Sequence, residues 1–243
     1  MQSWGLSDQG CVRKQNQDAY HIEKLDWNSL LCVVCDGMGG AKSGNIASTL
    51  AVDVFVEEVR RTWTSGITQY KLEQMLRGAV KLANFTVYDQ AQQFEEFAGM
   101  GTTLVAALIH GQRVTVVNVG DSRAYKVDSD GIRQITRDHS LVQMMVDRGE
   151  LSAERAKTYP GKNFITRAVG TDATVECDVF HLDVSKGDYF LLCSDGLSNM
   201  MDDQEILFEV VHGVNKQHCC QRLLSIAKNR GAPDNVTSVL VLV

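Results

Sequence analysis

Apolar residues follow two different spacings along the chain. Alternating or continuous runs of β-favouring residues predict strands over residues 2–10, 18–24, 29–35, 102–109, 113–119, 123–128, 132–136, 174–182, 188–193 and 236–243. Rows of apolar residues three or four positions apart predict helices over residues 44–62, 70–97, 140–149, 152–158, 203–212 and 216–229. Ser43 or Asn45 is the expected cap of the first helix.

The order of these elements predicts an α+β fold. Short turns at residues 110–112 and 129–131 join consecutive strands, which we therefore expect to pair antiparallel. The helices come in pairs and do not alternate with the strands, so the pattern does not favour a doubly wound parallel sheet. The 243 residues include two prolines and no Gly/Ser/Pro-rich linker, so we expect a single domain over residues 1–243.

An abrupt change of polarity ends the strand predicted at 29–35. Its apolar run stops at Asp36, and glycines follow at once. A carboxylate at the end of a buried strand needs a paired charge or a bound cation, and glycines allow close approach to the backbone. Similar junctions, in which an apolar strand runs into Asp, recur over residues 189–196 and 114–121. The repetition indicates a shared site for cations.

Acidic residues stand at each of these junctions and at two further turns. They are Asp18, Asp36, Asp121, Asp195 and Asp234. A single loop Asp is more typical of a turn, but carboxylates that meet at the ends of central strands cannot all ionise without cations. Oxygen ligands favour Mg²⁺ or Mn²⁺ over zinc, and two such ions activate water for attack at phosphorus. Arg13 is the candidate partner for the phosphate oxygens.

Composition and charge narrow the range of functions. The chain has 30 acidic and 24 basic residues, a net charge of −6, which argues against a nucleic-acid partner. No apolar run approaches the roughly 20 residues of a membrane span, and the first residues lack a signal-peptide pattern, so we expect a cytoplasmic protein with no membrane partner. Seven cysteines predict buried, reduced thiols and no disulfide framework.

Two glycine-rich segments come close to nucleotide-binding loops without meeting their requirements. Residues 37–43 lie between a strand and a helix, as a phosphate-binding P-loop does, but Asp36 and Ala41 stand where that loop needs glycine. The second segment, from Gly99, lacks the last glycine of a dinucleotide fingerprint, because Leu104 stands there. Neither segment predicts a nucleotide site.

Seven short motifs occur in one order over nearly the whole chain. They are Arg13-x-x-Asn16-Gln17-Asp18, Asp36-Gly37-Met38-Gly39-Gly40, Gly101-Thr102-Thr103, Gly120-Asp121-Ser122-Arg123, Asp138-His139-Ser140, Ser194-Asp195-Gly196 and Asp234-Asn235-Val236-Thr237. Each motif alone is weak, whereas seven in register are specific. The series resembles the metal-dependent protein phosphatases of the type 2C serine/threonine class, especially their compact bacterial members.

The resemblance implies a fold and an activity. The fold would be a four-layer αββα sandwich, in which helices flank two antiparallel sheets. The activity would be hydrolysis of phosphoserine and phosphothreonine in proteins, by direct attack of a water that bridges two Mn²⁺ or Mg²⁺ ions. No phosphoenzyme would form. The substrates would come from bacterial serine/threonine kinases, which the enzyme would oppose.

The resemblance also implies a set of metal ligands. Asp36 would bridge the two ions, and the carbonyl of Gly37 would contact one of them. Asp195 and Asp234 would hold the other ion. Asp121, together with Asp195, would hold a third and weaker ion.

Further residues would support this centre. Asp18 would order metal-bound waters, and Asn235 would support the ligands from behind. Arg13 would bind the phosphoryl group. The segment from about 146 to 166 resembles the family's mobile flap, which tunes substrate choice, and it includes Lys157, Tyr159 and Lys162.

The sequence departs from the family at the general acid. Many members have His at the position of Met38, and bacterial members with Met there commonly have His at the position of Ala41. This chain has neither, so the proton donor stays open between a metal-bound water, Lys42 and His139. Gln17 stands in place of a frequent Glu, which removes one charge near the metals.

Two alternatives to a general phosphatase remain open. The chain could be a regulatory phosphatase for one phosphorylated anti-anti-sigma-like partner, an alternative that the expected absence of a fused sensor domain makes less favoured. It could also be an inactive phosphatase fold that serves as a binding module, which the absent His would allow and the intact carboxylates oppose. In each case we expect a monomer.

Overall fold

The structure is a computed structural model that describes residues 1–156 and 158–243, without the side chains of residues 40–42. Its strands are β1 (Gln2–Asp8), β2 (Asp18–Asp26), β3 (Ser29–Met38), β4 (Gly101–Thr102), β5 (Leu104–His110), β6 (Arg113–Val119), β7 (Arg123–Asp128), β8 (Gly131–Gln134), β9 (Asp178–Asp183), β10 (Tyr189–Cys193) and β11 (Val236–Leu242). Its α-helices are α1 (Gly40–Thr62), α2 (Gln69–Gln93), α3 (Leu141–Asp147), α4 (Ala153–Ala156), α5 (Asp195–Ser198), α6 (Asp203–His212) and α7 (Cys219–Asn229). Short 3₁₀ helices are η1 (Glu95–Phe97) and η2 (Lys216–His218).

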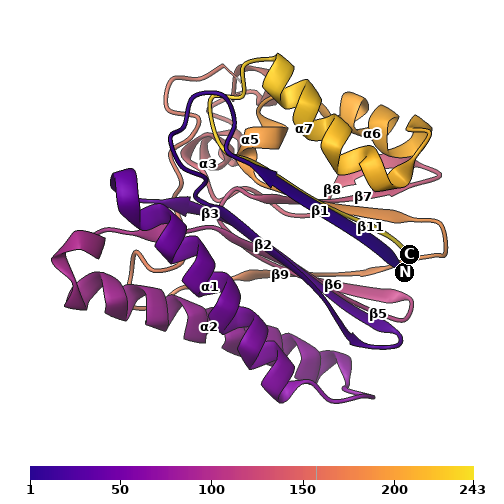
Figure 1. Ribbon diagram of the computed structural model, residues 1–243, viewed down its shortest axis with the longest axis horizontal. Helices are drawn as coiled ribbons and strands as arrows, with labels where there is room; N and C mark the ends of the chain where they lie inside the picture. Colours follow the sequence, from indigo (N-terminus) through magenta and orange to yellow (C-terminus); the bar gives the residue numbers. More distant parts are fainter. Residues whose placement is uncertain (157) are drawn as a thin grey trace.

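Two antiparallel sheets lie face to face between two pairs of helices. One sheet has the order β1-β11-β10-β7-β8, and the other has the order β2-β3-β5-β6-β9 with β4 paired to β3. Helices α1 and α2 cover the outer face of the second sheet, and α6 and α7 cover the first (Figure 1). The chain termini lie side by side because β1 pairs with β11. The predicted αββα architecture is confirmed.

Strand β3 shows why the apolar run in this part of the sequence is uninterrupted. Alternate side chains enter two different cores, because successive residues of a strand point to opposite faces. One set packs beneath α1 and α2 and consists of Leu31, Val33 and Cys35. The other set fills the space between the two sheets and consists of Leu30, Cys32 and Val34. Both faces of this strand are therefore buried.

The cysteines behave largely as predicted. All seven are free thiols, and six are buried. Cys32 and Cys35 belong to different cores, so they cannot share a metal ion. Cys11 is the exception to the expectation of burial, because it lies exposed in the turn between β1 and β2.

Two predictions about the first helix and the strand before it were wrong. Strand β3 continues to Met38, past the predicted end at residue 35, because β4 pairs with Gly37 and Met38. Helix α1 then begins at Gly40, and its cap position is Gly39, with φ 120° and no side-chain cap hydrogen bond. The expected caps, Ser43 and Asn45, therefore lie inside the helix. The hydroxyl of Ser43 instead donates back to the Gly39 carbonyl.

Three further differences lie at element boundaries. Helix α2 ends at Gln93 and not at 97, because Phe94 is extended, with φ −122° and ψ 118°. Strand β9 begins at Asp178 and not at 174, where its pairing with β6 starts. Helix α5 was not predicted, because four residues are too short to show a helical spacing of apolar positions.

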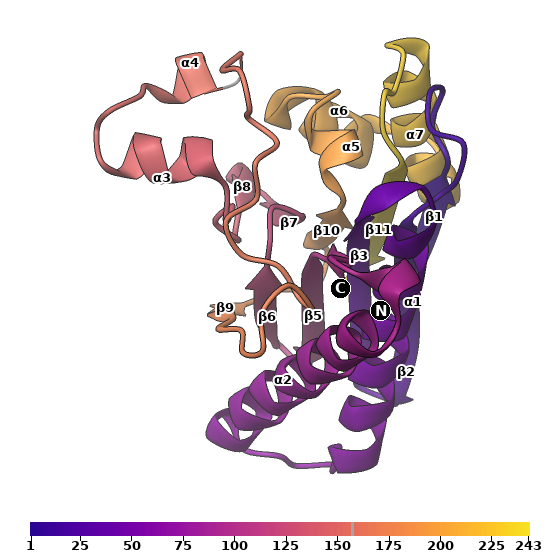
Figure 2. The same cartoon turned by 90° about the vertical axis from the view of Figure 1, so that its left-hand side faces the viewer.

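The segment that resembles a flap stands away from the sheets. Figure 2 shows α3 and α4 together beside the sandwich, joined to it by extended connections. The side chain of Ser140 caps α3 by accepting a hydrogen bond from Gln143 N. Lys157 lies outside the described residues. In the described part of the chain, no helix has the length and apolarity needed to cross a bilayer.

Candidate metal centre

The predicted carboxylates meet at one end of the two sheets. Asp36 lies in β3, Asp121 follows β6, Asp195 follows β10 and Asp234 precedes β11, and all four strands are interior strands of their sheets. Asp18 begins β2 and is the register partner of Asp36. Two sheets packed face to face thus bring together residues that are far apart in the sequence.

Asp36 is the electrostatic centre of this cluster. Burial raises the pKa of Asp36 well above its ordinary value. Repulsion from four other carboxylates raises this pKa further, in the order Asp18, Asp195, Asp121 and Asp234. The carboxyl groups of Asp36 and Asp195 lie close enough for each to affect the pKa of the other. The full set cannot be ionised together unless positive charge enters the site.

Asp121 and Asp18 are held in different surroundings. Burial raises the pKa of Asp121 to about 8, and repulsion from Asp195 adds to this. Burial raises the pKa of Asp18 to about 7, although hydrogen bonds partly oppose this effect. Thr237 and Ser194 donate those bonds to Asp18 Oδ2, over 2.6 Å and 2.7 Å.

Buried oxygens without partners test whether a cation fits here. The Oδ1 atoms of Asp18, Asp121 and Asp195 are buried and have no hydrogen-bond partner. In residues 1–156 and 158–243, no three His, Cys, Asp or Glu side chains are already spaced to hold an ion. The donor chemistry nevertheless fits a hard dication, because it offers several carboxylate oxygens and no nitrogen or sulfur. Asp18, Asp36, Asp121, Asp195 and Asp234 are the residues that could hold it.

Backbone contacts fix the position of Asp36 and Gly37. The Asp36 carbonyl accepts hydrogen bonds from Thr102 Oγ1 at 2.8 Å and from Thr103 N at 2.9 Å. The Asp36 N–H donates to Thr103 Oγ1 at 2.9 Å. A Cβ atom on Gly37 would lie 2.0 Å from the Gly44 carbonyl oxygen, so no other residue fits there. The Gly-Thr-Thr motif therefore anchors the carboxylate-bearing strand.

Asn235 holds the turn that carries Arg13. It is buried, and its side-chain amide bonds the backbone of that turn at Gln9, Gln15 and Gln17, over 2.8–2.9 Å. Arg13 is half exposed and donates to Asp234 Oδ2 at 2.7 Å. The structure thus places the predicted phosphate-binding cation directly beside a predicted metal ligand.

One polar side chain at the centre was not predicted. Asn199 Nδ2 donates to Asp195 Oδ2 at 3.0 Å, across one turn at the start of α5. Lys162, from the segment resembling a flap, donates to Asn199 Oδ1 at 3.2 Å. Burial raises the pKa of Asp195, and the charge of Lys162 opposes this shift only in part. Tyr159 lies half-buried in the same segment. The Asp–Asn spacing of four residues was the available signal, but α5 is too short to be recognised as a helix.

The open question of the proton donor is narrowed by the surroundings of His139. Its side chain is 7% exposed, and both ring nitrogens have neighbours in the protein. Gly120 N donates to Nδ1 at 3.0 Å, and Asp178 lies 3.2 Å from Nε2. This ring is therefore committed to structural contacts. The side chain of Lys42 lies outside the described residues.

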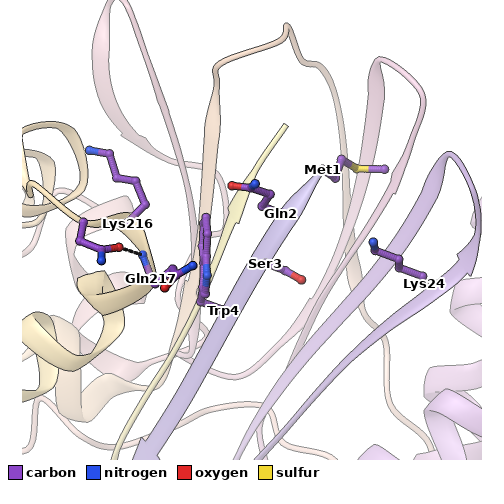
Figure 3. A pocket seen from close by; sticks show the side chains of 8 residues that line it. Met1, Gln2, Ser3, Trp4, Lys24, Lys216 and Gln217 are labelled. Atoms are coloured by element: carbon purple, nitrogen blue, oxygen red, sulfur yellow. Dashed lines mark hydrogen bonds between the residues drawn. The ribbon is translucent and has the colours of Figure 1, made fainter.

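Two cavities lie away from these carboxylates. One, of about 480 Å³, is at the start of β1 and is lined by residues 1–4, Lys24 and residues 215–217 (Figure 3). The other, of about 660 Å³, lies between α6 and α7 and is lined by Phe208 and Ile226 among others. Neither is lined by the clustered carboxylates, so the chemistry of the side chains, and not the size of a cavity, locates the site.

Known proteins match this chain over most of its length. The family model described as protein phosphatase 2C matches residues 12–225. A serine/threonine phosphatase, stp, of Listeria monocytogenes is 35% identical over 235 residues, which cover 97% of this chain and 93% of that protein.

Solved structures show the same fold. The serine/threonine phosphatase Stp1 of Staphylococcus aureus superposes with a TM-score of 0.93 at 38% identity, covering 99% of this chain and 94% of that one. A catalytic domain of the serine/threonine phosphatase PstP, solved in complex with two manganese ions, gives a TM-score of 0.85 at 33% identity, covering 98% of this chain and 96% of that one. This chain belongs to the protein phosphatase 2C family of serine/threonine phosphatases.

Proposed function

We propose that the clustered carboxylates hold two Mn²⁺ or Mg²⁺ ions, with a weaker site for a third. Asp36 would bridge the first two ions, with the Gly37 carbonyl on one and Asp195 and Asp234 on the other. Asp121 and Asp195 would serve the third. The observation that carries the proposal is the set of buried carboxylate oxygens that lack partners in the protein.

The chain's own residues would then divide the work of hydrolysis. When bound, the ions supply an activated water and neutralise charge on the phosphoryl group. Arg13 would leave Asp234 and bind phosphoryl oxygens, because its guanidinium is half exposed and lies at the edge of the cluster. Asp18, held by Thr237 and Ser194, would accept hydrogen bonds from ordered water through its free Oδ1.

The substrates we propose are proteins that carry phosphoserine or phosphothreonine. Such substrates require a serine/threonine kinase, whose action this enzyme would reverse. A net charge of −6 gives no basis for binding nucleic acid. We further propose that residues 1–243 act as one catalytic domain, monomeric and cytoplasmic, with the segment 146–166 shaping substrate choice. A shared core between the two sheets supports the single domain.

Hydrolysis of a phosphothreonine peptide tests this function. We expect turnover in Mn²⁺, none in chelator, and a loss of at least about 10²-fold in Asp195→Asn, because the substitution removes a ligand charge. Asp53→Asn, an exposed change on α1, is the matched control and should retain activity. Turnover that survives chelation would refute the metal chemistry. Binding of Mn²⁺ without turnover on any phosphoprotein would instead indicate a binding module.

A further inference from the structure

A reciprocal pair of hydrogen bonds joins His139 to the turn that carries Asp121. His139 N donates to the Gly120 carbonyl at 3.0 Å, and Gly120 N donates to His139 Nδ1 at 3.0 Å. Asn118 Nδ2 also donates to the Gly120 carbonyl, at 3.2 Å. Gly120 has φ 104°, and a Cβ there would lie 2.6 Å from a methyl carbon of Thr103. Three hydrogen bonds and close packing thus hold the backbone just before Asp121.

The two ring nitrogens of His139 face different partners. Nδ1 accepts the hydrogen bond from Gly120 N. Nε2 lies 3.0 Å from Arg167 Nη1 and 3.2 Å from Asp178 Oδ2, and Arg167 donates to Asp178 Oδ1 at 2.8 Å. Burial lowers the pKa of His139, which favours the neutral ring. Nε2 therefore lies against the ion pair of Arg167 and Asp178, and Arg167 directly follows Thr166 in the sequence.

The same histidine lies where the segment resembling a flap begins and ends. The His139 carbonyl accepts from Thr166 N at 2.8 Å, and Leu141 N donates to the Phe164 carbonyl at 2.8 Å. An antiparallel bridge between Ser140 and Ile165 lies between these two bonds. This short ladder closes the segment at its base, where it leaves and rejoins the sandwich (Figure 2).

The ring of His139 thus has one nitrogen on the Asp121 turn and the other on the Arg167–Asp178 ion pair, next to the flap base at Thr166. We propose that His139 is a positioning residue that links these two structures, so that the affinity of Asp121 for a cation depends on the Nδ1 contact and the closure of the flap base depends on the Nε2 contact. The link to cation affinity rests on the proposed function. The link between the two contacts does not.

Two substitutions separate the ring nitrogens. The amide of Asn reaches about as far as Nδ1, and the longer amide of Gln reaches about as far as Nε2. His139→Asn should retain the acceptor for Gly120 N–H and lose the contact to Asp178. His139→Gln should retain the contact to Asp178 and lose the acceptor. Asp178→Asn changes the Nε2 side alone, because Asp178 pairs with Arg167 beside the flap base, and its side chain is 38% exposed, so the change should not prevent folding.

Two measurements on the metal-free protein report the contacts directly. Amide hydrogen exchange at Gly120 should quicken about tenfold in His139→Gln and stay near wild type in His139→Asn, because a lost buried hydrogen bond is worth roughly this factor. Limited trypsin cleavage after Arg148 and Arg155 should quicken several-fold in His139→Asn and in Asp178→Asn. It should change little in His139→Gln.

Calorimetric titration with Mn²⁺ then tests the link to the metal ligand. We expect the weakest class of Mn²⁺ site to lose about tenfold in affinity in His139→Gln, and to be unchanged in His139→Asn and Asp178→Asn. Equal effects of both His139 variants in all assays would mean simple loss of packing and would overturn the proposal. So would an unchanged Gly120 exchange rate in His139→Gln. If the His139 variants fail to fold, Asp178→Asn decides: unchanged trypsin cleavage refutes the flap link.

The two proposals can fail separately. If the wild-type protein binds no Mn²⁺, the proposed metal centre is refuted. The exchange and cleavage results still test whether Nδ1 and Nε2 of His139 have separate roles. If the wild-type protein binds Mn²⁺ but both His139 variants change the Mn²⁺ affinity equally, only the positioning role is refuted.

Discussion

Removing one charge from the carboxylate cluster is expected to stabilise the metal-free protein. Asp121→Asn keeps the size of the side chain and removes its ionisation. Burial, with repulsion from Asp195, raises the pKa of Asp121 to about 8 from an ordinary 3.8. Between these two pH values the native protein holds a proton that the unfolded chain has released. The stability contributed by this group therefore falls as the pH rises through that window, and it stays lost above pH 8.

The size of the effect follows from the same linkage. One proton contributes at most about 1.4 kcal/mol to the free energy of unfolding for each pH unit. Neighbouring carboxylates share protons with Asp121, which reduces the slope. We therefore expect the difference in free energy of unfolding between Asp121→Asn and wild type to grow by about 1–3 kcal/mol between pH 6 and pH 8.5, in favour of the variant. At about 2–4 °C per kcal/mol for a chain of this size, Tm differences of several degrees should result.

Thermal unfolding followed by circular dichroism measures this prediction. The proteins are wild type, Asp121→Asn and the exposed control Asp53→Asn, each in chelator and in saturating Mn²⁺. In Mn²⁺ the advantage of Asp121→Asn should shrink or reverse, because bound cations relieve the repulsion. A Tm difference between Asp121→Asn and wild type in chelator that does not change with pH would contradict the charge argument. The same Tm difference in the Asp53→Asn control would contradict it too.

Two substitutions, with one control, probe the surroundings of the carboxylates. Gly196→Ala should destabilise by about 2 kcal/mol or more in chemical denaturation, because its Cβ would lie 1.9 Å from the Asn235 carbonyl oxygen; a stability equal to wild type would show that this backbone contact is not needed. Gly78→Ala, in helix α2 with no atom within 4 Å of the new Cβ, is the matched control and should stabilise by about 0.5–1 kcal/mol. Arg13→Ala should lower kcat/KM on a phosphopeptide by about 10²-fold, while calorimetry should show Mn²⁺ affinity kept or raised, because Asp234 loses a competing cation; weaker Mn²⁺ binding would argue against the phosphate role.

The types of the main elements could be predicted because the side chains that a strand or a helix buries recur at a characteristic spacing along the sequence. Strands of the inner layers are buried on both faces, and amphipathic helices have one apolar stripe, so each pattern is distinct. The boundaries could not be predicted where a distant segment sets them. Helix α1 starts early because the chain turns at Gly39, and β3 is extended by pairing with β4, from which more than 60 residues separate it.

The site could be predicted in its acidic residues but not in their supports. A run of apolar residues that ends in Asp is visible without coordinates, as at Asp36 and Asp195. The hydroxyls that hold Asp18 are not, because Ser194 and Thr237 are 176 and 219 residues away from it and reach it only through strand register. Small polar residues in strands have many possible partners, and only the sheet order selects one.

The placement of the cluster explains how the fold tolerates it. Buried like charges oppose folding, so the backbone that carries them must be held by interactions that do not depend on the carboxylates themselves. Thr102 and Thr103 hold the backbone of Asp36, and Asn235 holds the turn that leads to Asp18. The apolar cores lie between each sheet and its helices and between the two sheets, while the carboxylates gather at one end. Stability and chemistry are therefore supplied by different parts of the same strands. The carboxylates at one end can remain available to cations while the apolar cores keep the protein folded.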